Sequence, residues 1–263
     1  MNGKKFACFD IDATLHRGTQ SGESLGESVA RECVRRGLAP ANSFHNSDGL
    51  LELYEKRLGS YADYSEELVR AIENGLFTGL RVDEVRSIAS EIASRERDRT
   101  YVFTRELLRA VQGVGYCTVA ISGSMHEVAK PFATSWGFEH VFGSEMSSNE
   151  HGLYYGTPDQ RVVYARNKGE VVRGLVEREH LLMRDSIAVG DTLSDASMLE
   201  AVDYPILFNP DQKLLEYFEQ LTRPWWLVVE RRLVYCYGVG LPDDVEEALR
   251  DALSKAGAYV KYL

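Results

Sequence analysis

Residues 5–15 read KFACFDIDATL, an apolar run that gives way abruptly to two acids, Asp10 and Asp12. So short a run without polar alternation predicts a strand that is buried on both faces. Strands of this kind belong to parallel sheets, because the helical crossovers of such sheets cover both faces. A merely solvated acid has no need of such a position, so the end of this strand is a candidate functional site.

Two later apolar runs end in the same way. YCTVAI (116–121) leads into Ser122-Gly123-Ser124, expected as a turn, and DSIAV (185–189) leads into Gly190-Asp191-Thr192, with Asp195 close behind. Strands and helices alternate after residue 100, which predicts an α/β fold with a parallel sheet covered on both faces. Ligands of such sheets bind beyond the carboxyl ends of the strands, so these polar groups are expected at one edge.

Residues 20–97 have a different character, because their apolar residues recur at helical spacing and no convincing strand interrupts them. Ser24 is expected to begin the first helix of this segment. The C-terminal part holds a candidate hairpin (WWLVV, then RLVYCY) and a last helix over 243–255. The predicted division is a catalytic core over 1–18 and 98–222, a helical domain over 19–97, and an extension over 223–263 that packs on the core.

Composition excludes several classes of protein. With 44% apolar and 27% charged residues among 263, the chain is neither disordered nor fibrous, and no apolar run is long enough to span a membrane. The net charge of −10 disfavours nucleic acid as a partner. Four scattered cysteines without a CxxC pattern indicate reduced core thiols. With no signal peptide recognised, we expect a cytoplasmic protein, monomeric or homodimeric, without a membrane partner.

The acids at the strand ends predict a metal site. Carboxylates that crowd together raise one another's pKa, and Mg²⁺ relieves the repulsion while leaving positions for water or phosphate oxygens. Lys168, in the run NKGE, is the candidate cation on the phosphate side. A metal and a lysine facing a free carboxylate suit phosphoryl transfer through an aspartyl-phosphate. A second carboxyl two residues along can then protonate the leaving oxygen and later deprotonate water.

The set of motifs, in this order, resembles the haloacid dehalogenase-like (HAD) phosphohydrolases and, within them, the phosphoserine phosphatase-like branch. The resemblance covers residues 5 to about 218 and rests on FDIDATL (9–15), AISGS (120–124), Lys168 and AVGDTLSDASML (188–199). It implies a doubly wound, Rossmann-like core with a helical C1-type cap inserted after the first strand. It also implies a Mg²⁺-dependent phosphatase whose partner is a small phosphorylated metabolite.

Roles follow from the resemblance position by position. Asp10 corresponds to the nucleophile, and Asp12 to the general acid/base whose backbone carbonyl also binds Mg²⁺. The remaining matches are Thr14, Ser122 and Gly123 for the phosphate, Lys168 for charge neutralisation, and Asp191 and Asp195, with Asp10, for the metal.

Two departures from the family pattern limit the assignment. Ala13 stands where Gly or Ser is usual, and a small side chain still fits there. Serine-specific members carry a Glu shortly after the loop; here Glu23 comes later, so phosphoserine itself is not predicted. His16 is interpreted as an entrance histidine rather than a catalytic base. Two alternatives stay open: a phosphotransferase with the same intermediate, and a non-catalytic protein that binds a phosphate ligand.

Overall fold

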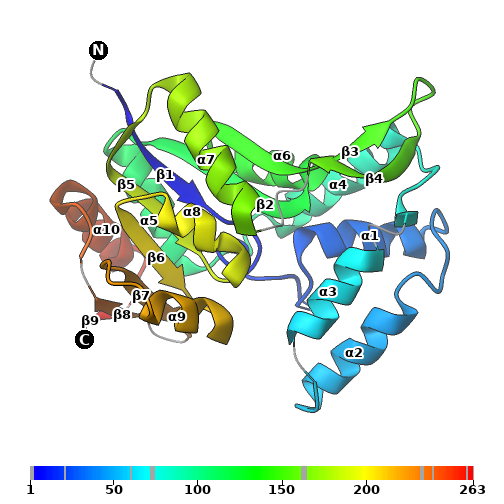
Figure 1. Cartoon of the computed structure of the whole chain (residues 1–263), viewed down its shortest axis with the longest axis horizontal. Helices are drawn as coiled ribbons and strands as arrows, with labels where there is room; N and C mark the ends of the chain where they lie inside the picture. The colour runs from blue at the N-terminus through cyan, green and yellow to red at the C-terminus, as the bar shows by residue number, and fades with distance from the viewer. Residues whose placement is uncertain are drawn as a thin grey trace.

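The computed structural model describes residues 3–20, 22–59, 61–71, 75–160, 165–231, 234–238, 240–258 and 260–262. Its centre is a nine-stranded sheet in the order β4-β3-β2-β1-β5-β6-β7-β8-β9 (Figure 1). The strands are β1 (Lys5–Phe9), β2 (Cys117–Met125), β3 (His140–Ser148), β4 (Tyr154–Gln160), β5 (Leu182–Gly190), β6 (Tyr204–Phe208), β7 (Trp226–Glu230), β8 (Val234–Gly238) and β9 (Val260–Tyr262).

In the order of the sheet, the six strands β3-β2-β1-β5-β6-β7 pair in parallel with their neighbours. Strand β4 pairs antiparallel with β3, and β8 pairs antiparallel with β7. The helices are α1 (Leu25–Arg35), α2 (His45–Glu55), α3 (Tyr61–Ala71), α4 (Val82–Glu96), α5 (Val102–Gly113), α6 (His126–Ser135), α7 (Ala165–Glu179), α8 (Ala196–Glu200), α9 (Gln212–Glu219) and α10 (Asp243–Lys255). No helix in the described part of the chain is both long and apolar enough to cross a bilayer.

Strand β1 shows how the sheet is buried on both faces. Phe6 and Cys8 point into one core cluster with residues of α7, α8 and α9, whereas Ala7 and Phe9 point into another with residues of α5, α6 and α10. A strand that contacts both clusters has to be apolar throughout, which is why its sequence shows no alternation. The predicted α/β fold, with a doubly wound Rossmann-like sheet and a helical insertion after the first strand, is confirmed.

The inserted helices α1–α4 lie between β1 and α5 in the chain. Figure 1 shows α2 and α3 projecting away from the sheet, whereas α1 and α4 also pack against α6. Ser24 caps α1 as expected, because its side chain accepts a hydrogen bond from the backbone of Glu27. The exact domain limits stay a prediction, since α1 and α4 of the insertion also pack against α6 of the core.

One expectation about local structure was wrong, and one strand was missed. The predicted turn at Ser122-Gly123-Ser124 is part of β2, which continues to Met125 because Met125 pairs with Ser144 of β3 beyond a register shift. The short strand β9 was not expected; it pairs in parallel with β8.

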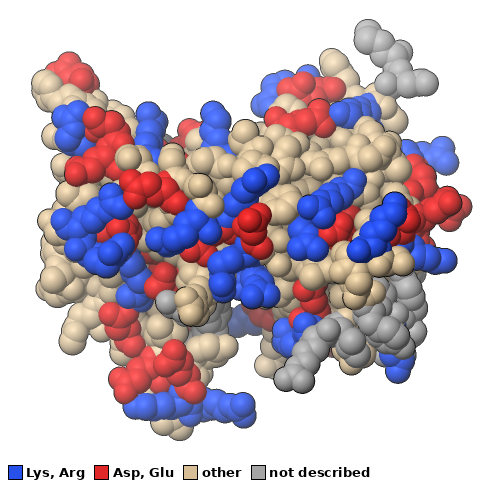
Figure 2. Space-filling view, turned by 180° about the vertical axis from the view of Figure 1, so that it is seen from behind, with Lys and Arg blue, Asp and Glu red and all other residues tan. Residues whose placement is uncertain are grey.

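On the face seen in Figure 2, basic and acidic side chains are interspersed.

The C-terminal extension supplies a helix cap to the core. Glu230, at the end of β7, accepts hydrogen bonds from the backbone nitrogens of Val102 at 2.9 Å and Phe103 at 2.7 Å, which open α5. We expect Glu230→Ala to lower the free energy of unfolding by about 1–2 kcal/mol, because these amides lose their acceptor and the helix dipole its anion. Urea denaturation measures the change, with Glu230→Gln as an intermediate control; an unchanged midpoint would contradict the cap.

Candidate active site

Lys168 links two acids at the carboxyl edge of the sheet. Asp10 directly follows β1, and its backbone nitrogen donates to the carbonyl of Val189 at 2.9 Å, so its place is set by strand pairing. Lys168 lies in the first turn of α7, and its side chain is buried. Its Nζ lies 2.6 Å from Oδ1 of Asp10 and 2.5 Å from Oδ1 of Asp195. The predicted lysine therefore reaches the predicted nucleophile.

Three acids form a buried cluster around this lysine. One carboxylate oxygen each from Asp10, Asp191 and Asp195 lie within 4.8 Å of one another. The loop after β5 positions the last two, because Oδ2 of Asp195 accepts hydrogen bonds from the backbone nitrogens of Asp191 at 2.9 Å and Thr192 at 3.0 Å. Gly190 allows the loop to adopt this conformation, since a Cβ at position 190 would lie only 2.5 Å from Cβ of Asp195.

The cluster carries more negative charge than one lysine can balance. Burial raises the pKa of Asp10 to about 7, with Lys168 opposing the shift and Asp195 adding to it. Burial, followed by the charges of Asp10 and Asp195, raises the pKa of Asp191 well above its usual range. Burial opposes the charged form of Lys168, but Asp10 and Asp195 outweigh it and raise its pKa. With all three acids ionised, the cluster therefore has a net negative charge that Lys168 alone does not balance.

The donor set fits a hard divalent cation. In the described part of the chain, Asp195 uses both oxygens, one for Lys168 and one for the loop amides. Asp10 and Asp191 each have a hydrogen bond to one carboxylate oxygen only, from Lys168 and from Oγ1 of Thr14 at 3.0 Å. Mg²⁺ is commonly bound by one or two carboxylates together with phosphate oxygens and water. Asp10 and Asp191 would hold such an ion.

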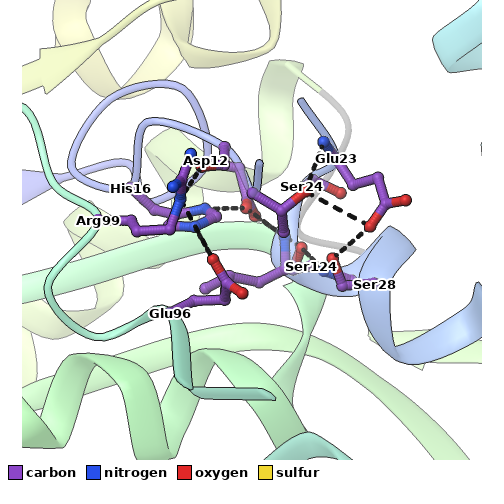
Figure 3. A network of polar contacts seen from close by, with 12 residues as sticks. Asp12, His16, Glu23, Ser24, Ser28, Glu96, Arg99 and Ser124 are labelled. Atoms are coloured by element: carbon purple, nitrogen blue, oxygen red, sulfur yellow. Dashed lines mark hydrogen bonds and ion pairs between the residues drawn. The ribbon is translucent and has the colours of Figure 1, made fainter. Parts of the chain in front are cut away.

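Asp12 lies in a second polar network, beside the N-terminus of α1 (Figure 3). Its Oδ1 accepts a hydrogen bond from the backbone nitrogen of Leu25 at 2.7 Å, and its Oδ2 accepts from Oγ of Ser124 at 2.6 Å and Oγ of Ser122 at 3.4 Å. Burial opposes ionisation of Asp12, but the interaction with His16, followed by those with Ser124 and Leu25, leaves its pKa lowered. These contacts favour the carboxylate form of Asp12 while no substrate is bound.

The residues predicted to hold phosphate are divided between the two networks. Thr14 and Ser122 are fully buried, and Thr14 contacts Asp191 whereas Ser122 contacts Asp12. The carbonyl of Gly123 accepts a hydrogen bond from Oγ of Ser144 at 2.8 Å, which fixes the backbone beside Ser122. The structure thus brings Thr14 together with the acidic cluster and Ser122 together with Asp12.

Two residues of the second network were missed or misread from the sequence. Ser124 stands in the quoted motif, yet its contact with Asp12 and with the backbone nitrogen of Gly26, at 3.0 Å, was not foreseen. The interpretation of His16 as an entrance histidine was wrong, because its side chain has no exposed surface. A polar residue in a loop carries no periodic signal, so only packing reveals its burial.

Comparison with known proteins agrees with this arrangement. A family model described as haloacid dehalogenase-like hydrolase matches residues 7–200. The phosphoserine phosphatase of Archaeoglobus fulgidus is 25% identical over 211 residues, 80% of this chain and 54% of that protein. A probable phosphatase of Mycobacterium tuberculosis is 28% identical over 221 residues, 83% of this chain and 73% of that protein. The chain therefore spans about half the length of the first of these relatives.

Solved structures show the same fold. A substrate-bound phosphoserine phosphatase complex aligns with a TM-score of 0.56 and 19% identity, over 82% of this chain and 91% of the other. Cytosolic 5'-nucleotidase IIIB bound to cytidine aligns with a TM-score of 0.60 and 18% identity, over 96% of this chain and 87% of the other. Because the family model covers most of the chain and the fold agrees with it, the chain belongs to the haloacid dehalogenase-like hydrolases.

Proposed function

We propose that this protein is a Mg²⁺-dependent phosphatase that hydrolyses a small phosphomonoester, with Asp10 as the nucleophile. The observation that carries the proposal is the contact of Lys168 with Asp10 inside a buried cluster of three acids. The buried lysine favours the charged form of Asp10 and lies close to where a phosphoryl group would add negative charge. When bound, Mg²⁺ would neutralise the charge of the cluster and of the phosphate oxygens.

The residues of this chain divide the chemistry into two steps. Asp12 first takes up a proton from solvent as the substrate binds. A carboxylate oxygen of Asp10 then attacks phosphorus, and the bond to the alcohol oxygen breaks while Asp12 gives that oxygen its proton. Asp12, now a carboxylate, takes a proton from water, and the hydroxide displaces phosphate from Asp10. Thr14, Ser122 and the backbone of Gly123 hold the phosphate oxygens.

Glu23 supports a substrate that carries a positive charge. Hydrogen bonds bring Glu23 back beside Thr19, since the backbone nitrogen of Gly22 donates to the carbonyl of Thr19 at 3.0 Å and that of Glu23 to Oγ1 of Thr19 at 3.1 Å. Glu23 therefore returns to the start of α1, two residues before Leu25, which contacts Asp12. Phosphorylated amino acids and amino alcohols, the former in line with the named relatives, come first in a substrate screen.

A phosphate-release screen tests the function. Phosphorylated amino acids, amino alcohols, sugars and 4-nitrophenyl phosphate are incubated with the protein and Mg²⁺, and again with a chelator. We expect release that the chelator stops and excess Mg²⁺ restores. Failure on every substrate would favour the non-catalytic binder, and transfer to an added alcohol in place of release would favour the phosphotransferase.

The charge of the cluster also predicts how stability depends on pH. The pKa of Asp10 is about 7 in the folded chain against an ordinary value of 3.8, so its contribution to stability is complete below the ordinary value and is lost as the pH rises through about 7. Asp191 acts in the same direction. Without a divalent ion, the melting temperature is therefore expected to fall between about pH 5 and pH 8.

Mg²⁺ should oppose that fall, because it binds the ionised carboxylates and stabilises the folded chain. Thermal denaturation with and without Mg²⁺ at both ends of this pH range measures the effect, with Asp191→Asn as the control that loses it. A Mg²⁺-induced rise in melting temperature as large at the acidic end as at the alkaline end would contradict the site.

A further inference from the structure

His16 lies at the junction where the chain leaves the sheet for the inserted helices and returns from them. The two crossings are hydrogen-bonded side by side, from the backbone nitrogen of Arg17 to the carbonyl of Arg99 at 3.0 Å and from that of Tyr101 to Leu15 at 3.1 Å. The ring of His16 is fully buried and meets the edge of Phe132, with 5.5 Å between ring centroids. Its position is thus fixed from both sides.

Each ring nitrogen of His16 faces a carboxylate (Figure 3). Nδ1 lies 3.5 Å from Oδ1 of Asp12, and Nε2 lies 3.9 Å from Oε2 of Glu96, the last residue of α4. Neither nitrogen has a hydrogen-bond partner among the described residues. Glu96 is itself buried and held by Arg95, whose Nε donates to its Oε1 at 2.8 Å, and by Arg99, whose Nε lies 3.4 Å from Oε2.

Packing alone does not account for this arrangement. A buried ring nitrogen without a hydrogen bond costs free energy, and an apolar ring would pack against Phe132 without that cost. The distances to Asp12 and Glu96 exceed hydrogen-bond length by only a few tenths of an ångström to about 1 Å. Catalytic hydrogen bonds are often long in ligand-free enzymes and shorten when substrate binds. The ring therefore stands where a small closure would complete its contact with Asp12.

We propose that His16 is a positioning residue for Asp12, a role that rests on the function proposed above. On substrate binding, Nδ1 donates to Oδ1 of Asp12 and holds the carboxyl group in one orientation, while Glu96 fixes the far side of the ring. The end of α4 is thereby connected to the acid that protonates the leaving alcohol. His16 itself touches neither substrate nor phosphate.

Leaving-group dependence tests the role. The value of kcat/KM reports the steps up to release of the alcohol, and 4-nitrophenolate leaves without a proton whereas an alkyl alcohol needs one from Asp12. We expect His16→Phe to lower kcat/KM for the best alkyl phosphate of the screen by about 10²-fold, and for 4-nitrophenyl phosphate by less than about threefold. His16→Gln, whose amide reaches towards the Nε2 position, should behave like the Phe variant.

The rescue variant is His16→Asn, whose amide nitrogen lies near the Nδ1 position and can still donate to Asp12. It should keep kcat/KM for the alkyl phosphate within about fivefold of the unmodified protein. The control is Leu249→Ala, a buried change in α10 that reduces stability away from the site. In it, the ratio of the two kcat/KM values should be unchanged.

The outcomes separate this inference from the function on which it rests. Equal losses on both phosphates in His16→Phe, or an Asn variant as impaired as the Gln variant, would overturn the role of His16 and leave the phosphatase assignment standing. An unmodified protein that hydrolyses neither phosphate would overturn both. Thermal denaturation confirms that each variant is folded.

Discussion

Asp10→Asn is expected to lower kcat for phosphate release by about 10⁴-fold or more, because an amide cannot form the acyl-phosphate. The side chain keeps nearly the same shape, and its backbone contact with Val189 does not depend on the carboxylate. Phosphate release from the best substrate of the screen measures the loss. Mass spectrometry after rapid acid quenching should find one phosphoryl group on the unmodified protein and none on the variant.

Stability is the control for this prediction. Burial raises the pKa of Asp10, so the ionised form of Asp10 destabilises the folded chain when no metal is bound. Asp10→Asn should therefore melt at the same or a higher temperature than the unmodified protein at about pH 8 without Mg²⁺. A variant that is folded yet turns over at the unmodified rate would refute Asp10 as the nucleophile.

The sequence was sufficient for the fold and for the meeting of the acids. Apolar runs of sequence that give way to Asp10, Ser122 and Asp191 imply one sheet edge, because parallel strands share the direction in which they end. The contact of Lys168 with Asp10 is harder to predict, since nothing in the sequence around Lys168 requires its side chain to face Asp10. The order of the motifs supplied that link, and the structure shows the contact.

The second network could not be predicted in the same way. The contacts of Asp12 depend on how closely α1 approaches β2, and Gly26 permits that approach because a Cβ there would lie 2.7 Å from Oγ of Ser124. His16 is buried because α4 and α6 pack over the loop, which no local pattern of residues reports. The same holds for two tyrosines of the inserted helices, Tyr54 of α2 and Tyr64 of α3, which the sequence does not distinguish. The structure shows that Tyr54 is exposed and Tyr64 is buried.

The role of Asp195 changes most between sequence and structure. By position it was a candidate metal ligand, and it does belong to the acidic cluster. Its hydrogen bonds to the amides of Asp191 and Thr192, and to Lys168, show that it also holds together the loop and the lysine. Spacing in a sequence identifies an acid at a site, whereas only coordinates show which of its oxygens are already in use.

Lys168→Met is expected to lower both activity and stability. A lysine that neutralises the nucleophile and the phosphoryl group typically contributes about 10²–10³-fold to kcat. Removing one partner of a buried ion pair costs about 3–5 kcal/mol, because Asp10 and Asp195 stay buried without their counter-charge. Urea denaturation and phosphate release measure the two losses, and Lys168→Arg tests whether charge alone is sufficient.

A second substitution separates charge from shape. Asp195→Asn removes one of the charges that Lys168 balances, while the side-chain oxygen of asparagine can still accept the hydrogen bonds from Asp191 and Thr192. Added to Lys168→Met, it should therefore recover part of the stability but none of the activity, since Asp10 still lacks its cation. A double variant whose losses of stability are the sum of the two single losses would mean that Lys168 and Asp195 do not interact energetically, and the charge balance inferred for the cluster would be wrong.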